Sequence, residues 1–469
     1  MNIFRLLFIS ILLISCKLSD EEARKPIAKK ESQDILAPIK ENIIAHSVLY
    51  EANIRQYSIE GTFNAFAKDL PILKKMGVKI IWLMPINPIS NKKSKGPLGS
   101  YYAVSNHTKV NPDFGTLEDF KALVKKAHAL GIYVILDWAL EYTGWDHNWV
   151  KQNNTFYLKN RNGEIINPIN SQKEKLSDLT DLTDLAALNF NNLEMREAMR
   201  QAMIYWVKEV NIDGYRIDKA YTVPQEFYNN TITALKEVKP LFFIGDTGIY
   251  NQGGLELVSK FDATYDWSGY LISKDIAQGK RKAYDYSRHI NKTIKRYDAD
   301  NTLVNFISNH SENSWNGTVK ESYGNADHTF MALNFTTPGM PLVYSGQEYD
   351  LNKRLHFFEK DSFPKKVGKT MHLIQQLGAL KNNHRALASG KKRGSYKKVQ
   401  TSKTNQIYAF ERGKDGDTLV VIANLSKEYA QFTMPLNGMY RRYQDYKTKQ
   451  LSSTYQYYLK PWEFWILIK

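Results

Sequence analysis

Amphipathic helical patterns and short apolar runs alternate along most of the chain. The first helical pattern covers residues 62–76, with its apolar side chains on one face, and Gly77 ends it. A continuous apolar run at residues 79–85 follows directly and fits a buried strand. The pattern therefore predicts a helix that leads straight into a strand.

This alternation recurs toward the carboxyl end of the chain. Further helical patterns cover residues 116–131 and 195–210, and further apolar runs cover residues 133–137, 214–218, 241–244, 302–307 and 341–344. Short buried strands separated by helices predict a parallel sheet closed as a (β/α)8 TIM barrel, which we expect to span residues 41–389. An open doubly wound sheet is the structural alternative, but no glycine-rich phosphate turn follows the first predicted strand.

The pattern changes to an alternation with period 2 from about residue 390. The alternating runs are residues 406–410, 418–423, 431–434 and 462–468. Such runs, with no helical pattern between them, predict a C-terminal antiparallel β-sandwich over residues 390–469.

The amino terminus carries a different signal. Residues 6–14 are an apolar run broken only by Ser10, which is too short to span a bilayer and fits the core of a secretory signal peptide. Residues 13–16 resemble the lipobox of bacterial lipoproteins, in which the cysteine is lipidated after cleavage. An ordinary cleaved signal is the alternative. Cys16 is the only cysteine, so no internal disulfide can form.

We therefore expect residues 1–16 to be a lipoprotein signal and residues 17–40 a charged tether without periodicity. The acidic segment at residues 17–22 resembles the export tract of some bacterial lipoproteins. The expected location is the outer membrane, at the cell surface, with the chain held to the membrane by a lipid on Cys16.

The composition indicates which classes of binding partner to expect. The chain has 469 residues, 43% of them hydrophobic and 24% charged, which is ordinary for a globular protein. The formal net charge of +16 invites a nucleic-acid partner, but the basic residues are scattered and no zinc-ligand spacing or arginine-rich arm is present. We expect no nucleic acid. The 29 Tyr and 9 Trp are a weak indication of sugar-stacking surfaces.

Candidate chemistry lies where the predicted strands end. Asp137, Asp218, Asp246 and residues 308–311 all follow or close an apolar run, and a barrel of this type builds its site at the carboxyl ends of its strands. Arg216 and Asp218 share one side of their strand. A cation beside a carboxylate keeps it ionised, as a nucleophile requires, although a structural ion pair is the alternative.

With these residues in view, the chain resembles the α-amylase family, glycoside hydrolase family 13. The segments that carry the resemblance are residues 81–89 (IWLMPINPI), 110–115 (VNPDFG), 184–189 (DLAALN), 211–219 (NIDGYRIDK), 306–310 (FISNH) and 339–348 (GMPLVYSGQE). It implies a small inserted domain after the third strand, at residues 138–190. It also implies retaining hydrolysis of starch-like α-glucans or maltooligosaccharides by two carboxyl groups about 5–5.5 Å apart.

Several site positions carry over from the family pattern. By resemblance, Asp218 is the nucleophile and Arg216 its partner. Tyr102 is the residue that stacks under the reacting sugar, and His310 binds the sugar hydroxyls. Asp137 is expected to bind substrate beside them.

Other positions depart from that pattern. Asp246 stands where the family has its acid/base glutamate, and Ser311 stands where it has a third carboxylate. Glu141 and Tyr142 replace an asparagine and a histidine. We therefore expect hydrolysis to be strongly weakened or lost. An active α-glucan hydrolase of altered specificity and a non-catalytic glucan-binding component of a starch-uptake complex are the alternatives.

No cofactor is required by the resemblance, but the family often holds a structural Ca²⁺ near the third-strand loop. Glu141 and Asp184 offer the oxygen ligands that Ca²⁺ prefers and are the candidate metal ligands, although the usual asparagine is absent.

Overall fold

The computed structural model describes residues 36–168, 182–248, 254–297, 301–445 and 447–469. The predicted signal peptide, the lipobox with Cys16 and most of the predicted tether lie outside these residues. In the described ranges, no helix has the length and apolar character needed to cross a membrane.

Eight parallel strands close into a barrel in the order β1-β10-β9-β8-β7-β6-β3-β2. Their bounds are β1 Val48–Ala52, β2 Val78–Leu83, β3 Tyr133–Ala139, β6 Gly214–Asp218, β7 Phe242–Gly245, β8 Ala263–Tyr265, β9 Thr302–Asn305 and β10 Met340–Tyr344. This confirms the predicted barrel and excludes the open sheet. Two strands were missed in the sequence. β1 has a glutamate within its apolar run, and β8 is only three residues long.

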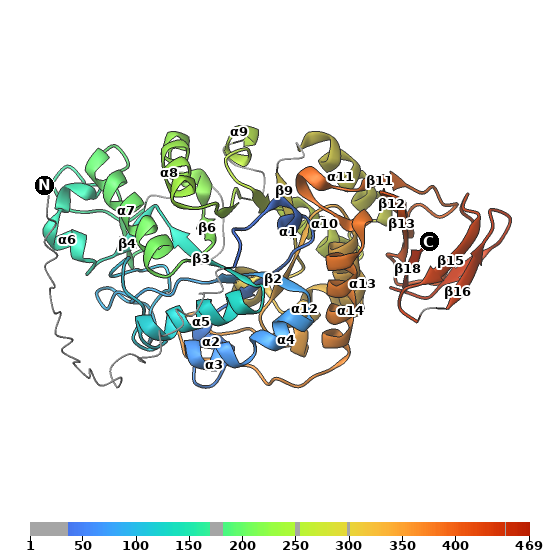
Figure 1. Cartoon of the computed structure of the whole chain (residues 1–469), viewed down its shortest axis with the longest axis horizontal. Helices are drawn as coiled ribbons and strands as arrows, with labels where there is room; N and C mark the ends of the chain where they lie inside the picture. The colour runs from blue at the N-terminus through green and yellow to red at the C-terminus, as the bar shows by residue number, and fades with distance from the viewer. Residues whose placement is uncertain (1–35, 169–181, 249–253, 298–300, 446) are drawn as a thin grey trace, which may run out of the picture. The chain divides into compact units, whose positions relative to one another are not determined.

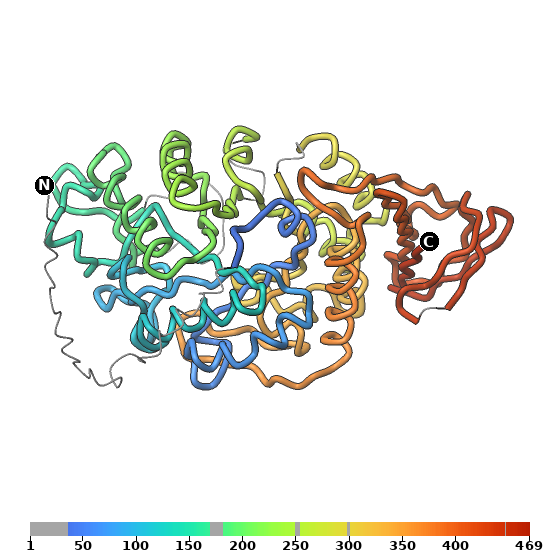
Figure 2. Tube along the Cα trace, viewed as in Figure 1, coloured from blue at the N-terminus to red at the C-terminus, as the bar shows by residue number. Residues whose placement is uncertain are grey.

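The barrel strands are linked through helices, as Figure 1 and the chain trace in Figure 2 show. The longer helices are α5 Leu117–Ala129, α7 Leu193–Glu209, α8 Gln225–Val238, α10 Trp267–Ala277, α11 Ala283–Arg296, α13 Asp327–Thr336 and α14 Lys369–Asn383. Shorter ones are α1 Glu41–Ala45, α2 Ile54–Tyr57, α9 Gly254–Val258 and α12 Val319–Tyr323. Local sequence sets these ends: Thr116 and Asp119 form a reciprocal capping box at the start of α5.

The single helix predicted at residues 62–76 is wrong in one respect. The structure has two short helices there, α3 Phe63–Lys68 and α4 Leu70–Lys75, which meet at Asp69. Pro71 lies in the first turn of α4 and has no N–H to continue the hydrogen bonds of α3. The apolar periodicity passes through this break, so the pattern alone did not reveal it.

Between β3 and α7 the chain leaves the barrel. The strands β4 Tyr142–Gly144 and β5 Leu185–Ala187 pair antiparallel, with α6 Asn148–Gln152 between them in sequence. In Figure 1, α6 and β4 are drawn at the same end of the barrel domain as α7. This excursion lies within the predicted inserted domain.

The C-terminal antiparallel sandwich is confirmed. Six strands pair in the order β11-β12-β13-β18-β15-β16, and a second sheet pairs β14 with β17. Their bounds are β11 Ser395–Lys398, β12 Ile407–Lys414, β13 Asp417–Asn424, β14 Ala430–Phe432, β15 Gly438–Arg442, β16 Thr448–Leu451, β17 Tyr457–Leu459 and β18 Phe464–Ile468. Buried apolar side chains of both sheets form one cluster, which includes Val420, Phe432 and Leu459.

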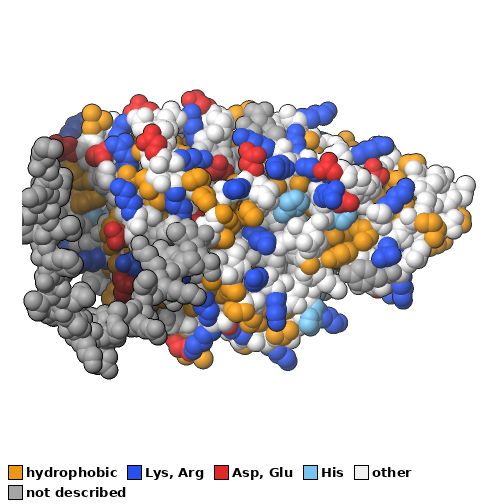
Figure 3. All heavy atoms as spheres, in the orientation of Figure 1, with side chains coloured by type: hydrophobic (Ala, Val, Ile, Leu, Met, Phe, Trp, Pro, Cys, Tyr) orange, Lys and Arg blue, Asp and Glu red, His pale blue; other side chains and the backbone are white. Residues whose placement is uncertain are grey.

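On the face drawn in Figure 3, Lys and Arg side chains are interspersed with acidic and apolar ones. On that face they do not merge into one continuous basic stripe.

Candidate active site

The barrel brings the predicted site residues together at the carboxyl ends of its strands. Asp137 on β3 lies level with Arg216 on β6, and Ile217 lies level with Gly245, the residue before Asp246. His310 follows β9. Parallel strands in register thus carry these side chains to one end of the barrel, where sites of this fold are built.

Arg216 is the centre of this arrangement. Its guanidinium is buried, with 3% of the side chain exposed, and it forms ion pairs with three carboxylates. The Nη1 atom lies 3.0 Å from Asp137 Oδ1 and 2.7 Å from Asp218 Oδ1, and Nη2 lies 2.8 Å from Asp246 Oδ2. One planar cation with several N–H groups can orient three carboxylates at once. The interpretation of Arg216 and Asp218 as an isolated structural pair is therefore too narrow.

Asp218 accepts hydrogen bonds on both of its oxygens. Arg216 donates to Oδ1, and the Tyr142 hydroxyl donates to Oδ2 at 3.0 Å. Burial opposes ionisation of Asp218, but Arg216, Lys219 and His310 outweigh it and lower the pKa of this carboxyl. Burial and the Asp218 charge raise the pKa of Tyr142 well above its usual value, so Tyr142 stays a donor. Asp218 is an ionised carboxylate near neutral pH.

Asp246 is also held as an acceptor on both oxygens. Arg216 donates to Oδ2, while the Trp267 indole N–H and the Gly248 backbone N–H donate to Oδ1 at 3.1 and 3.2 Å. Hydrogen bonds to the charged form favour that form. Three donors from three different elements thus surround the residue at the expected acid/base position. Trp267 was not predicted as a site residue.

A chain of hydrogen bonds crosses the site from β1 to β3. Glu51 Oε1 accepts from His310 Nδ1 at 2.5 Å, His310 Nε2 lies 3.1 Å from the Tyr102 hydroxyl, and that hydroxyl donates to Asp137 at 3.0 Å. Because Tyr102 donates its own proton to the hydrogen bond with Asp137, its oxygen is free to accept a hydrogen bond from the N–H of His310 Nε2. The chain is complete when both ring nitrogens of His310 carry protons.

The electrostatics of these groups agree with that arrangement. Burial opposes the charge on His310, but Glu51 raises the pKa of the imidazole above its ordinary value. Burial raises the pKa of Asp137 to about 6, against the opposing effect of Arg216. Glu51 was missed in the sequence because β1 was missed. The signal that could have found it is a glutamate inside the apolar run VLYEA.

An aromatic wall continues from Tyr102. The Phe357 ring lies nearly parallel to Tyr102 with 6.4 Å between the ring centroids, and Trp315 packs against Phe357 at 5.5 Å. Both Phe357 and Trp315 are partly exposed. Sequence reasoning did not single out these two rings.

No side chain next to Ser311 supplies the carboxylate that the family has at this position. Among the described residues, none forms a hydrogen bond with its side chain. The adjacent Glu312 is directed away from Asp218 and Asp246: its carboxylate bonds to the Tyr270 hydroxyl and to Asn316 Nδ2. The site as described thus has no third carboxylate at the expected position.

The candidate calcium ligands do not fit one ion. The β4–β5 register places Glu141 level with Leu188 and Asp184 level with Trp145, so about 13 Å of strand separates the two acids. Asp184 instead pairs with Lys95 at 3.1 Å. Within the described ranges, no group of three or more His, Cys, Asp or Glu could hold a metal. We therefore assign no role to Ca²⁺, and this prediction from the resemblance is not supported by the geometry.

Comparison with known proteins identifies relatives of this chain. A model of the α-amylase catalytic domain matches residues 40–240. Alpha-amylase 2 of Dictyoglomus thermophilum is 24% identical over 409 residues, which are 84% of this chain and 68% of that protein. The chain spans about two thirds or less of the length of the first curated relatives it matches.

Solved structures match over nearly their whole length. A maltogenic α-amylase from Thermotoga neapolitana superposes with a TM-score of 0.80 at 26% identity, covering 91% of this chain and 99% of that one. An α-amylase from Geobacillus thermoleovorans, complexed with acarbose, shares the fold with a TM-score of 0.73 at 21% identity, covering 91% and 98%. The chain belongs to the α-amylase family, glycoside hydrolase family 13.

Proposed function

We propose that the barrel cleft of this α-amylase-family chain binds starch-like α-glucans and that its capacity to hydrolyse them is strongly weakened or lost. The observation that carries the proposal is the set of hydrogen bonds that Asp246 accepts. Retaining hydrolysis needs a protonated carboxyl at this position to donate to the leaving oxygen. Here Arg216, Trp267 and Gly248 all donate to Asp246.

The length of the Asp246 side chain adds to this. An aspartate is one methylene shorter than the glutamate expected at this position, and a misplacement of about 1 Å can cost about 100-fold in rate. The Arg216 bond also draws the carboxyl toward the buried guanidinium. Both effects reduce proton transfer to a leaving group in the cleft.

Loss of the third carboxylate acts on the transition state. The positive charge that develops on the sugar ring is stabilised by preorganised negative groups, and a serine hydroxyl at position 311 carries no charge. Asp218 can still attack, but its Oδ2 is engaged by Tyr142. A charged nucleophile that lacks both a proton donor and a third carboxylate is better suited to binding a glucan than to hydrolysing it.

Sugar binding is supported by the groups that remain. Tyr102 and the neighbouring Phe357 offer ring faces, and His310 and Asp137 offer polar atoms beside them. The Asp218 and Asp246 side chains retain 11% and 12% exposure, so both carboxylates reach solvent. The acarbose complex of the structurally similar Geobacillus α-amylase supports a glucan-type ligand by analogy.

The test is titration calorimetry with maltoheptaose, run beside a chromatographic product assay on the same full chain. We expect binding without appreciable product, and loss of binding in Tyr102→Ala. Ordinary amylase turnover that disappears in Asp218→Ala would overturn the proposal and indicate an active hydrolase of altered specificity. Absence of both binding and turnover would also overturn it.

Binding without turnover is also what a glucan-binding component of a starch-uptake complex requires. The two roles differ in partners. Co-purification of the full chain from membranes with other glucan-binding proteins, unchanged in Asp218→Ala, would favour the complex.

We further propose that the chain is exported and held at the outer cell surface by a lipid on Cys16. The lipobox-like residues 13–16 support this. We expect the chain to sediment with membranes, to incorporate labelled fatty acid, and to be cleaved by protease added to intact cells. Cys16→Ser should abolish the label and release the chain, whereas label retained in Cys16→Ser would contradict the anchor.

A further inference from the structure

The two-stranded sheet of β14 and β17 has an outer face that no described element covers. Gln431 lies opposite Tyr458, and their strand neighbours Ala430, Phe432, Tyr457 and Leu459 are buried. Side chains alternate between the two faces of a strand, so Gln431 and Tyr458 point away from the core. The same alternation places Tyr429 and Gln456 on this outer face.

The outer face, which we define as Tyr429, Gln431, Gln456 and Tyr458, combines bare aromatic rings with amides. Tyr429 is 73% exposed and Tyr458 is 61% exposed. They are diagonal neighbours across the two strands, about 7–8 Å apart. One step further along the sheet, the Gln431 amide donates to the Gln456 side chain. Two tyrosines thus lie beside a pair of amides that still has donors and acceptors to offer.

A groove lies between residues 402–406 and the Tyr429, Gln431 and Gln456 side of this outer face. Its volume is about 400 Å³, within the range of small-ligand sites, and its lining includes Tyr429, Gln431 and Gln456. The groove wall is fixed by hydrogen bonds, because the Thr433 backbone N–H donates to Ser402 Oγ and Gln406 donates to Glu428. These hydrogen bonds connect the turn at residues 402–406 to the β14 segment that carries the outer face.

The charge of the groove selects the kind of ligand. Its charged lining residues are one lysine, Lys403, and one glutamate, Glu428. This near-neutral groove lies in a chain with a formal net charge of +16, so it offers little attraction to a polyanion. Flat rings with amides beside them match a neutral polymer that has apolar C–H faces and hydroxyl groups. An α-glucan has this chemistry.

We propose that the outer face of β14 and β17 is a second α-glucan-binding site, separate from the barrel cleft. Tyr429 and Tyr458 stack on glucose units, and Gln431 and Gln456 hydrogen-bond to their hydroxyls. The choice of an α-glucan rests on the proposed function of the cleft. A long glucan that meets both sites gains apparent affinity without any change at either one.

The experiment measures retention on amylopectin in native affinity electrophoresis and calorimetric binding of maltotriose, with the full chain throughout. The test variant is Tyr429→Ala/Tyr458→Ala, and the matched control is Tyr284→Ala, which removes a 46% exposed tyrosine from α11. We expect the test variant to lose about 100-fold in apparent affinity for amylopectin, the low end of what two linked contacts provide. The control should bind like the parent.

A cleft variant separates the two proposals. His310→Ala should keep residual amylopectin retention, and adding Tyr429→Ala/Tyr458→Ala should remove it. If His310→Ala alone removes all retention, or if the tyrosine changes have no effect, the second site is overturned while cleft binding stands.

Tyrosine-dependent retention with no maltotriose binding in the cleft would overturn the proposed function alone. A change in oligomeric state in the tyrosine variant, without a change in retention, would mean that this face binds another copy of the chain and would overturn the proposal.

Discussion

At the scale of single residues, Arg216 is the cation that the three carboxylates of the site share. Burial disfavours its charge, but Asp137 and Asp218 more than compensate and raise the pKa of the guanidinium well above its usual value. Burial alone would raise the pKa of Asp218, but the charge of Arg216 helps to lower it. A family site needs one of two catalytic carboxyls protonated and the other charged. Here the same guanidinium contacts both Asp218 and Asp246.

Restoring the family residues should therefore restore chemistry. We predict that Asp246→Glu raises the rate of maltoheptaose hydrolysis, and that adding Ser311→Asp raises it by about 100-fold or more over the parent, because an acid and a clamp are then in place. Chromatography of the hydrolysis products measures this rate. Asp275→Glu, a partly exposed aspartate on α10, is the control and should change nothing. A double variant as slow as the parent would show that the altered carboxyls are not what limits turnover.

The buried pair of Glu51 and His310 predicts a pH-dependent stability. The folded-state pKa of His310 is raised, so the stability from this pair is fully present below the unfolded pKa of about 6.5 and is lost as pH rises through the higher folded value. Removing one member of a buried pair costs about 3–5 kcal/mol. Glu51→Gln should therefore be destabilised most near pH 6, with the deficit shrinking toward pH 9.

Urea unfolding of the parent and Glu51→Gln at a series of pH values measures this difference. Because the two chains share every other titrating group, the difference isolates the pair. A deficit that is constant across the pH range would mean that His310 does not change its charge there.

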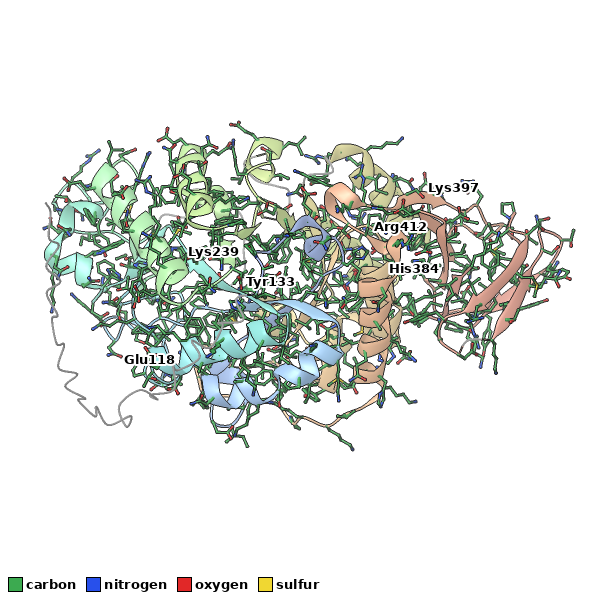
Figure 4. The ribbon with its side chains drawn as sticks, viewed as in Figure 1. Glu118, Tyr133, Lys239, His384, Lys397 and Arg412 are labelled. Carbon is green, nitrogen blue, oxygen red and sulfur yellow. The ribbon has the colours of Figure 1, made fainter. Side chains whose placement is uncertain are left out.

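At the scale of elements, the amino ends of β3 and β6 are joined through one carboxylate. Asp213 Oδ2 accepts from His128 of α5 at 2.7 Å and from the Val134 backbone at 2.8 Å. Lys239, labelled in Figure 4 and located just after α8, donates to Asp213 Oδ1 at 3.0 Å. Asp213 is 3% exposed. It fixes two helices against the strands that carry Asp137, Arg216 and Asp218.

We predict that Asp213→Ala lowers the free energy of unfolding by about 3–5 kcal/mol, because buried donors from three elements lose their acceptor. Asp275→Ala removes a surface pair with Arg281 and should cost about 1 kcal/mol or less. Urea unfolding followed by circular dichroism compares the two. Equal losses would show that the buried network contributes no more than a surface pair.

The helices and strands also show which elements could be predicted from the sequence pattern. Runs such as residues 241–244 and 341–344 became β7 and β10, because a continuous apolar stretch next to a helical pattern is a local signal. β1 and β8 were missed because a buried glutamate interrupts the first and the second has three residues. Both strands find their place only when the barrel closes around them.

At the scale of the whole described molecule, two buried basic side chains link α14 and the C-terminal strands to the barrel. Lys381 Nζ donates to the Gly339 and Leu387 carbonyls at 2.9 and 2.6 Å. Arg412 on β12, labelled in Figure 4, donates to the Thr336 and Ala388 carbonyls at 3.0 and 3.1 Å. Burial lowers the pKa of Arg412 to about 10 and lowers that of Lys381 well below its usual value. Carbonyl oxygens, not carboxylates, satisfy both.

We predict that Arg412→Met lowers the free energy of unfolding by about 3–5 kcal/mol, because it leaves several buried carbonyls without a donor. The C-terminal strands should become accessible to limited proteolysis before the barrel does. Arg441→Met, on β15 at the far end of the same sheet, is the control. Identical digestion of the two variants would contradict a junction that depends on Arg412.

The sequence by itself determined the barrel, the C-terminal sandwich, the family motifs, and the substitution of Asp246 and Ser311. These are properties of local periodicity and of residue identity at matched positions. Only the tertiary structure decided which groups meet. Glu51 and His310 are 259 residues apart, Trp267 binds Asp246 from another element, and Asp184 turns to Lys95 and away from Glu141. Barrel closure and strand pairing set these contacts, and no periodicity along the chain records them.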